Sequence, residues 1–142
     1  MEIIDRKQLL ERALVARKKA YAPYSGFSVG AALLCDDGKI FEGCNIESAS
    51  FTPTCCAERV AIFKAISELG SDVAIKAIAV VGGKDAATEP CLPCGVCRQV
   101  MSEFMPPDAE VILANGENTV TYKLKELLPY AFNLKEGADN NG

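Results

Sequence analysis

The sequence contains no histidine. This absence excludes a Ser-His-Asp triad, a Cys-His catalytic pair and any histidine metal ligand. Acid–base chemistry in this chain must therefore use Glu, Asp, Cys, Tyr or Lys side chains. Long apolar runs are also absent, because no stretch approaches the roughly 20 residues that a membrane-spanning helix needs. The first 20 residues lack the apolar segment of a signal peptide, so we expect a cytoplasmic protein with no membrane partner.

Basic side chains are outnumbered by acidic ones. The chain has 15 Lys and Arg against 19 Asp and Glu, which gives a net charge of −4 and a pI of about 4.9. No basic stripe runs along the sequence, so a nucleic-acid polyanion is not expected as a partner. The charge does not exclude a small neutral substrate.

The length and composition favour one folded unit. The chain has 142 residues, and 49% of them are hydrophobic, which is enough to build a core. We predict a single domain over residues 1–135, followed by a polar tail over residues 136–142 that is rich in Gly and Asn.

The hydrophobic pattern alternates between helical and extended segments. Asp5 is expected to cap the first helix, whose apolar stripe is Leu9, Leu10, Ala13, Leu14 and Ala16. The order of elements predicts an α/β fold, a three-layer α/β/α sandwich with a mixed five-stranded sheet. The expected helices are 5–21, 55–69 and 94–104, with a helical turn at 125–128, and the expected strands are 27–35, 39–45, 73–81, 110–114 and 119–122.

The cysteines are the most informative residues. Their number is odd and a reducing compartment disfavours disulfides, so metal binding is the better interpretation of their clustering. The seven are Cys35, Cys44, Cys55, Cys56, Cys91, Cys94 and Cys97.

Three of these cysteines form a metal-ligand pattern. Cys56 stands at one predicted helix start, and Cys94 and Cys97 stand at another. Three thiolates on a tetrahedral zinc leave one position open, which is typical of catalytic rather than structural sites. Glu58 is two residues beyond Cys56, where it can move protons to and from a bound water. Cys56, and not its neighbour Cys55, has this Cys-Ala-Glu register. The four cysteines outside the ligand pattern, Cys35, Cys44, Cys55 and Cys91, are interpreted as small hydrophobic residues.

Zinc deaminases carry the signature H-x-E…P-C-x-x-C, with a glutamate that is not a ligand. Here Cys56 stands in the position of that histidine. The chain resembles the small tetrameric cytidine deaminases, whose zinc is held by three cysteines. The resemblance runs from about Leu9 to Phe132, with five motifs in the family's order: YAPYSGFSVGAALL, GCNIE, CAER, PCGVCRQV and ELLPYAF.

The resemblance implies a cofactor and an activity. It implies one zinc per chain, held by Cys56, Cys94 and Cys97, with Glu58 as the proton shuttle. The implied reaction is hydrolytic deamination of free cytidine and 2′-deoxycytidine to uridine and 2′-deoxyuridine plus ammonia, in pyrimidine salvage. Arg59 is expected to donate hydrogen bonds to the ligand sulfurs.

The resemblance also implies substrate contacts. Phe27 matches an aromatic residue that packs on the pyrimidine, and Asn45 and Glu47 match groups that hold the ribose hydroxyls. The backbone N–H of Ala57 matches a donor to the cytosine O2. Phe132 matches an aromatic residue that a neighbouring subunit supplies, which implies a homotetramer with shared active sites. Relatives often carry Tyr in the position of Phe51, which receives no polar role here.

Three other functions remain open on the sequence. A structural zinc module would have a fourth ligand and no glutamate beside the metal. A deaminase of the blasticidin type shares the cysteine–zinc core, although Asn45, Glu47 and Phe132 favour a plain nucleoside. A nucleic-acid editing deaminase is opposed by the negative net charge.

Overall fold

The structure is a computed structural model that describes residues 4–86, 89–132 and 134. Five strands form one mixed sheet in the order β2-β1-β3-β4-β5. Strands β3 and β4 run parallel, and every other neighbouring pair is antiparallel. The strands are β1 (Ser28–Cys35), β2 (Ile40–Cys44), β3 (Ile75–Gly83), β4 (Glu110–Asn115) and β5 (Asn118–Lys123).

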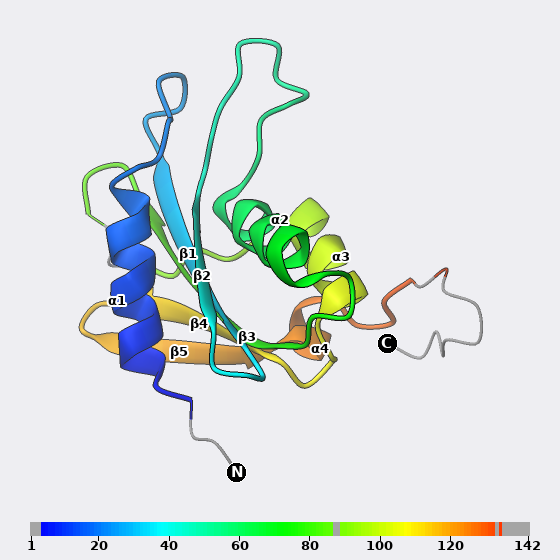
Figure 1. Ribbon diagram of the computed structural model, residues 1–142. Helices are drawn as coiled ribbons and strands as arrows, with labels where there is room; N and C mark the ends of the chain where they lie inside the picture. The colour runs from blue at the N-terminus through cyan, green and yellow to red at the C-terminus, as the bar shows by residue number, and fades with distance from the viewer. Residues whose placement is uncertain (1–3, 87–88, 133, 135–142) are drawn as a thin grey trace.

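Helices cover both faces of this sheet (Figure 1). Helix α1 (Arg6–Arg17) packs on one face, and α2 (Ala57–Leu69), α3 (Gly95–Phe104) and the short α4 (Leu124–Leu127) pack on the other. The predicted α/β/α sandwich with a five-stranded mixed sheet is therefore confirmed. The predicted tail at 136–142 lies outside the described residues. None of the helices in the described part of the chain is long and apolar enough to cross a membrane.

The two cores follow from the alternation of side chains along the central strands. On β1, Ala32 faces α1, whereas Ala31 and Leu33 face α2 and α3. Strand β3 has the same pattern, with Ala79 toward α1 and Val80 toward the other helices. Because β1 and β3 are buried on both faces, they form a rigid base for the loops at their ends.

Helix α1 ends earlier than the sequence predicts. Asp5 caps it as expected, accepting a hydrogen bond from the Gln8 N–H at 3.0 Å. The helix stops at Arg17 rather than near Tyr21, because Tyr21 pairs with the segment after β2: its N–H donates to the Asn45 carbonyl at 2.9 Å. The predicted apolar stripe also includes Leu14, which the structure shows to be 43% exposed, so that part of the prediction is wrong.

Several other boundaries shift by one or two residues, and two of these shifts can be traced to backbone pairing. Helix α2 begins at Ala57, because Cys55 forms a bridge with Ile46 in which each N–H donates to the other's carbonyl. Strand β3 runs on to Gly83, two residues beyond the predicted end, where it pairs with Ser28 of β1. Both differences arise from backbone pairing with another segment, which a local hydrophobic pattern does not report.

Candidate active site

The starts of α2 and α3 bring three thiols together. Cys56 is the N-cap of α2 and Cys94 is the N-cap of α3, both with extended backbone. Cys97 lies in the first turn of α3 and is fully buried. The three sulfurs lie within 4.8 Å of one another, and the Sγ atoms of Cys56 and Cys94 are 3.8 Å apart.

This arrangement fits a tetrahedral zinc ion. With Zn–S distances of about 2.3 Å, such an ion holds two sulfurs about 3.8 Å apart. The N-termini of α2 and α3 both lie at the cluster, and the positive end of a helix dipole favours negative charge beside it. Among the described residues the cluster has three members, so a fourth position stays open to another ligand.

Arg59 supplies the positive charge beside the cluster. Its Nη2 donates to the Sγ of Cys56 at 3.3 Å, as the sequence predicts. The Nε of the same guanidinium is buried and has no hydrogen-bond partner within the described part of the chain. The guanidinium also lies close enough to interact with Cys97. A thiolate at Cys97 would therefore give Arg59 a second negatively charged partner.

The hydrogen bond between Cys56 and Cys97 shifts the pKa values of these two thiols in opposite directions. The pKa of the Cys56 thiol is lowered to about 5, first by the hydrogen bond from Cys97 and then, against the effect of burial, by Arg59. The pKa of Cys97 is raised, because its proton is held by the Cys56 thiolate and its site is buried. Binding of a divalent metal releases such shared protons, since the ligands must be thiolates.

Glu58 is a buried carboxyl beside this cluster. Its exposed fraction is 4%, although glutamate is rarely buried in soluble proteins. Burial raises the pKa of the Glu58 carboxyl to about 7, and the nearby Cys56 thiolate adds to the effect. A carboxyl with this pKa can both accept and donate a proton at neutral pH.

A cavity of about 270 Å³ opens above Glu58. It gathers most of the residues that the sequence singled out, although they come from four separate segments. Cys97 lies outside its lining, buried beneath it. The lining residues are Ser25, Phe27, Val29, Asn45, Glu47, Thr54, Cys55, Cys56, Ala57, Glu58, Cys91, Leu92 and Cys94.

The polar side of the cavity is held in place by hydrogen bonds. The Asn45 amide oxygen accepts from the Val29 N–H, and its Nδ2 donates to the Phe27 carbonyl, both at 2.8 Å. The Glu47 Oε1 accepts from the backbone N–H groups of Tyr24 and Ser25, and its Oε2 accepts from the Ser25 hydroxyl. The Ser25 hydroxyl, followed by these N–H groups, lowers the pKa of the Glu47 carboxyl, so it is anionic at neutral pH.

The apolar side is built on Gly82, a residue that the sequence analysis did not single out. A Cβ at Gly82 would lie 2.7 Å from the Cys91 Sγ and 3.0 Å from both the Phe27 Cε1 and the Val29 Cγ2. Only glycine lets these three side chains converge on β3. Burial raises the pKa of Cys91 to about 11, which keeps it a neutral thiol. No spacing rule identifies such a wall, because its parts are brought together by the sheet.

Phe132 lies apart from this cavity. It is 61% exposed and is not among the lining residues. Its carbonyl accepts a hydrogen bond from Gln99 Nε2 at 3.1 Å, which fixes the backbone of the C-terminal segment against α3.

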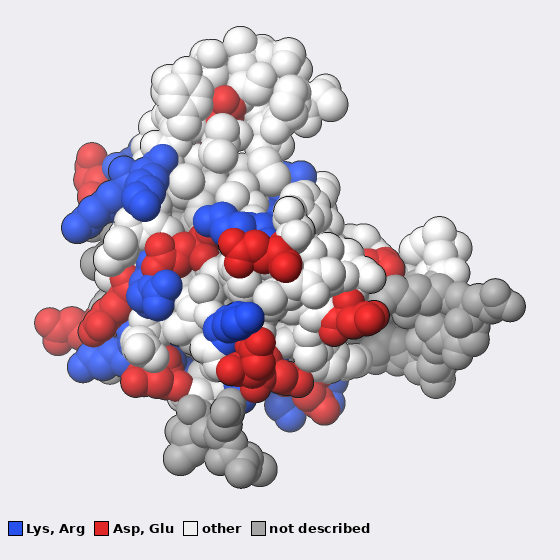
Figure 2. Space-filling view, in the orientation of Figure 1, with Lys and Arg blue, Asp and Glu red and all other residues white. Residues whose placement is uncertain are grey.

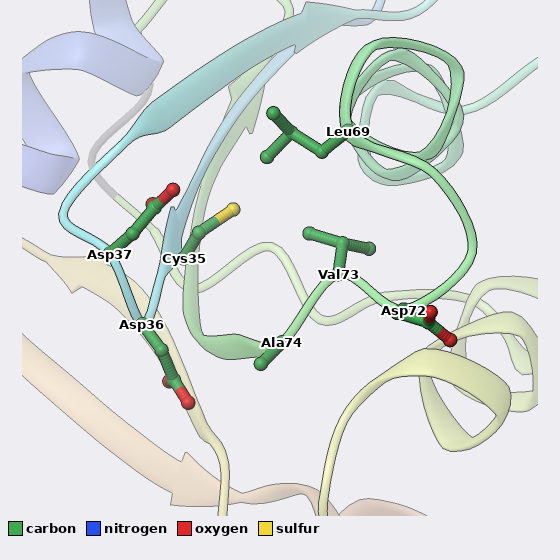
Figure 3. Close-up of a pocket in the computed structure, with 7 residues that line it drawn as sticks. All are labelled: Cys35, Asp36, Asp37, Leu69, Asp72, Val73 and Ala74. Atoms are coloured by element: carbon green, nitrogen blue, oxygen red, sulfur yellow. The ribbon is translucent and has the colours of Figure 1, made fainter.

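A second hollow of about 310 Å³ lies at the other end of β1 (Figure 3). The side chains of Cys35, Leu69 and Val73 point into it, whereas the carboxylates of Asp36 and Asp72 point away from its centre. These acidic groups do not converge on a point, so they do not form a cation site. No residue with a predicted role lines this hollow.

Comparison with known proteins agrees with this geometry. Residues 4–114 match the family described as "Cytidine and deoxycytidylate deaminase zinc-binding region". The chain is 48% identical over 137 residues to a cytidine deaminase of Halalkalibacterium halodurans, covering 96% of this chain and 100% of that protein. A cytidine deaminase of Mycobacterium tuberculosis is 38% identical over 136 residues, covering 96% of each chain.

Solved structures give the same result. The crystal structure of cytidine deaminase from Burkholderia pseudomallei superposes with a TM-score of 0.79 at 47% identity, covering 91% of this chain and 100% of that one. The structure from Mycobacterium tuberculosis gives a TM-score of 0.78 at 36% identity, covering 93% and 100%. Sequence, fold and the three-cysteine cluster thus agree, and the chain belongs to the cytidine and deoxycytidylate deaminase family.

Proposed function

We propose that this protein is a zinc-dependent enzyme that deaminates cytidine and 2′-deoxycytidine to uridine and 2′-deoxyuridine, releasing ammonia. One observation carries the proposal: a buried carboxyl, Glu58, lies beside three converging thiols in a cavity. The relatives named as cytidine deaminases support the choice of nucleoside. The cellular role that we infer is pyrimidine salvage in the cytoplasm, by a single domain over residues 1–135.

Cys56, Cys94 and Cys97 are the residues that would hold the zinc, one ion per chain. Two observations support thiolate ligands here: the spacing of the three sulfurs, and the buried Nε of Arg59, which has no hydrogen-bond partner within the described residues. When bound, zinc supplies a water acidic enough to act as a nucleophile near neutral pH. Arg59 offsets part of the negative charge of three thiolates by donating to Cys56.

Glu58 carries the protons through the reaction. As a carboxylate it accepts a proton from the attacking water and passes it to N3 of the pyrimidine. Attack at C4 then produces a tetrahedral carbon. Glu58, again a carboxylate, next takes the proton of the new C4 hydroxyl and delivers it to the 4-amino group, which leaves as ammonia while the C4 carbonyl forms. One carboxyl acts first as base and then as acid, a role that its pKa of about 7 supports.

The remaining lining residues orient the nucleoside. Phe27 offers a ring for the pyrimidine on the apolar side of the cavity. Ala57 is the first residue of α2, so its N–H has no partner within the helix and can donate to the cytosine O2. Asn45 retains a second amide proton, and the anionic Glu47 retains acceptor capacity, so both can bind ribose hydroxyls.

We also infer a homotetramer in which Phe132 enters the active site of a neighbouring subunit. The exposure of Phe63 on α2 and of Tyr130, Phe132 and Leu134 near the C-terminus supports an interface there. Phe132 does not reach the cavity of its own chain.

The partner is expected to be a small nucleoside rather than nucleic acid or a membrane. On the face that Figure 2 presents, acidic and basic side chains are interspersed, and no continuous basic surface extends across it. A polyanion is bound by a continuous basic surface, which this face does not offer.

An absorbance assay with metal analysis on the same sample tests this function. Loss of cytidine absorbance with about one zinc per chain is the expected result. Deamination of blasticidin S in preference to cytidine would favour the antibiotic deaminases, and deamination of single-stranded DNA would favour an editing enzyme. Zinc bound without turnover of any of these would favour a structural module.

A further inference from the structure

Arg98 on α3 binds two backbone carbonyls. Its Nε donates to the Pro93 carbonyl at 2.7 Å, and its Nη1 donates to the Leu127 carbonyl at 3.0 Å. Arg98 is half-buried and directly follows the buried Cys97. A planar guanidinium that bridges two carbonyls holds both in a fixed direction. Arg98 thus joins the loop before α3 to the end of α4.

The Pro93 bond restrains the backbone of Cys94. The Pro93 carbonyl belongs to the peptide unit that precedes Cys94, and the backbone N–H of Arg98 donates to the Cys94 carbonyl, in the unit that follows, at 2.9 Å. Peptide units are planar, so only φ and ψ of Cys94 lie between them. With both planes held by one residue, these angles are fixed at −70° and 169°. The direction of the Cys94 Cβ is then fixed as well.

Cys94 is the member of the cluster that needs this restraint most. It is the exposed one, whereas Cys97 is fully buried and Cys56 is half-buried and accepts a hydrogen bond from Arg59. An exposed ligand has little packing to hold its side chain, so its backbone must supply the geometry. Fully buried Pro93 beside it indicates that the loop itself is well packed.

The second carbonyl that Arg98 binds, that of Leu127, lies near the C-terminus. Leu127 is the last residue of α4, where a carbonyl has no partner within its helix, and Arg98 supplies one. The next residue on α3, Gln99, donates to the Phe132 carbonyl. Two consecutive residues after Cys97 therefore hold the segment 127–132.

We propose that Arg98 is a positioning residue for the metal site: it sets the direction of Cys94 and ties that ligand to the C-terminal segment. The proposal rests on the proposed function, because it takes Cys94 as a zinc ligand. It assigns to the residue after the third cysteine a role distinct from that of Arg59, which contacts a sulfur directly.

Arg98→Lys tests the proposal, because lysine keeps the charge but cannot bridge two carbonyls. Arg17→Lys is the matched control: Arg17 also binds two carbonyls, those of Ser28 at 2.9 Å and Gly83 at 2.7 Å, and it belongs to α1, on the face of the sheet opposite α2 and α3. Zinc affinity, measured by competition with a chelator, should fall about 10- to 100-fold in Arg98→Lys. It should stay within about twofold of wild type in Arg17→Lys, even if both variants melt earlier.

A second measurement separates positioning from general stability. Alkylation of the zinc-loaded protein, mapped by mass spectrometry, should accelerate at Cys94 more than at Cys56 in Arg98→Lys. Unchanged zinc affinity, or an equal loss in the Arg17→Lys control, would overturn the proposal. If Arg98→Lys and Arg98→Gln both fail to fold without metal, Arg98 is a general structural residue and the proposal is wrong. Wild-type protein that binds zinc but does not deaminate cytidine refutes the proposed function alone, and wild-type protein without zinc refutes both.

Discussion

Glu58 owes its proposed role to its surroundings. Burial raises the pKa of its carboxyl to about 7, and the Cys56 thiolate acts in the same direction. Both conditions penalise the carboxylate more than the neutral acid. An exposed glutamate would be ionised throughout the neutral range and would donate a proton poorly.

Glu58→Gln should abolish most turnover while leaving zinc and fold in place. The amide has nearly the same volume, but it cannot accept and return a proton. General acid–base groups contribute about 10²- to 10⁴-fold, so kcat for cytidine should fall by that factor. Steady-state kinetics, zinc analysis and a melting curve on one preparation check this. Turnover within a few-fold of wild type in a folded variant would remove Glu58 from the mechanism.

Substitution of the adjacent residues Cys55 and Cys56 should have opposite effects on zinc binding. Cys56 caps α2 with its sulfur near Cys94, whereas Cys55 pairs with Ile46 through its backbone. Cys55→Ala keeps that backbone pairing and should retain about one zinc per chain, whereas Cys56→Ala should lose it. Zinc analysis after dialysis decides, and the reverse result would shift the ligand register by one residue.

Residue chemistry was predictable from the sequence wherever one short motif carries it. The Cys-Ala-Glu and Cys-x-x-Cys spacings were enough to place Cys56, Glu58, Cys94 and Cys97 at one site, and the structure brings them together. Gly82 could not be found in this way, since two of the side chains that approach it, Phe27 and Val29, lie more than 50 residues earlier in the chain.

At the scale of elements, the order and type of helices and strands were predictable, but several ends were not. Hydrophobic period identifies α1, yet it ends at Arg17 because Tyr21 bonds to a segment more than 20 residues away. The start of α2 moves past Cys55 because the backbone of Cys55 pairs with that of Ile46. Element ends depend on which partner takes the free backbone groups, and that partner is known only once the chain is folded.

Two glycines allow the helices to approach the sheet closely. A Cβ at Gly43 on β2 would lie 2.5 Å from the Ala57 carbonyl oxygen and 2.6 Å from the Ala61 nitrogen, at the start of α2. A Cβ at Gly30 on β1 would lie 2.0 Å from the Ala13 carbonyl oxygen on α1. These neighbours are backbone atoms, so a side chain must displace the helix.

Gly43→Ala should therefore weaken both the fold and the metal site, whereas Gly30→Ala should weaken the fold alone. Overpacking costs about 1–3 kcal/mol or more in unfolding free energy for each variant. Only Gly43→Ala pushes on the turn that carries Cys56 and Glu58, so only it should lower zinc affinity. Denaturant unfolding of the metal-free proteins and chelator competition measure the two effects. Equal zinc affinity in both variants would contradict this coupling between β2 and the site.

At the scale of the whole molecule, a single chain leaves apolar side chains exposed on α2 and near the C-terminus. Phe63 on α2 is 46% exposed, and Tyr130 and Phe132 near the C-terminus are 89% and 61% exposed. Tyr130 also has a positive φ of 57°, a conformation that is uncommon for a residue other than glycine. In the proposed tetramer, a neighbouring subunit that covered this segment would bury the exposed rings of Tyr130 and Phe132.

Mixing two variants, each impaired in a different way, tests whether Phe132 acts across a subunit boundary. Phe132→Ala should keep zinc and mainly raise KM, because it removes an aromatic contact to the substrate, while Glu58→Gln removes the proton shuttle. If subunits exchange, about a quarter of the sites in an equal mixture should combine an intact Glu58 with an intact Phe132 from its neighbour. Activity should then rise above that of either variant alone, whereas Phe132 acting within its own chain would give no rescue. Light scattering must establish the tetramer, and exchange must be proved with tagged chains, so that absence of rescue counts against the shared site. A fully active monomer would exclude it outright.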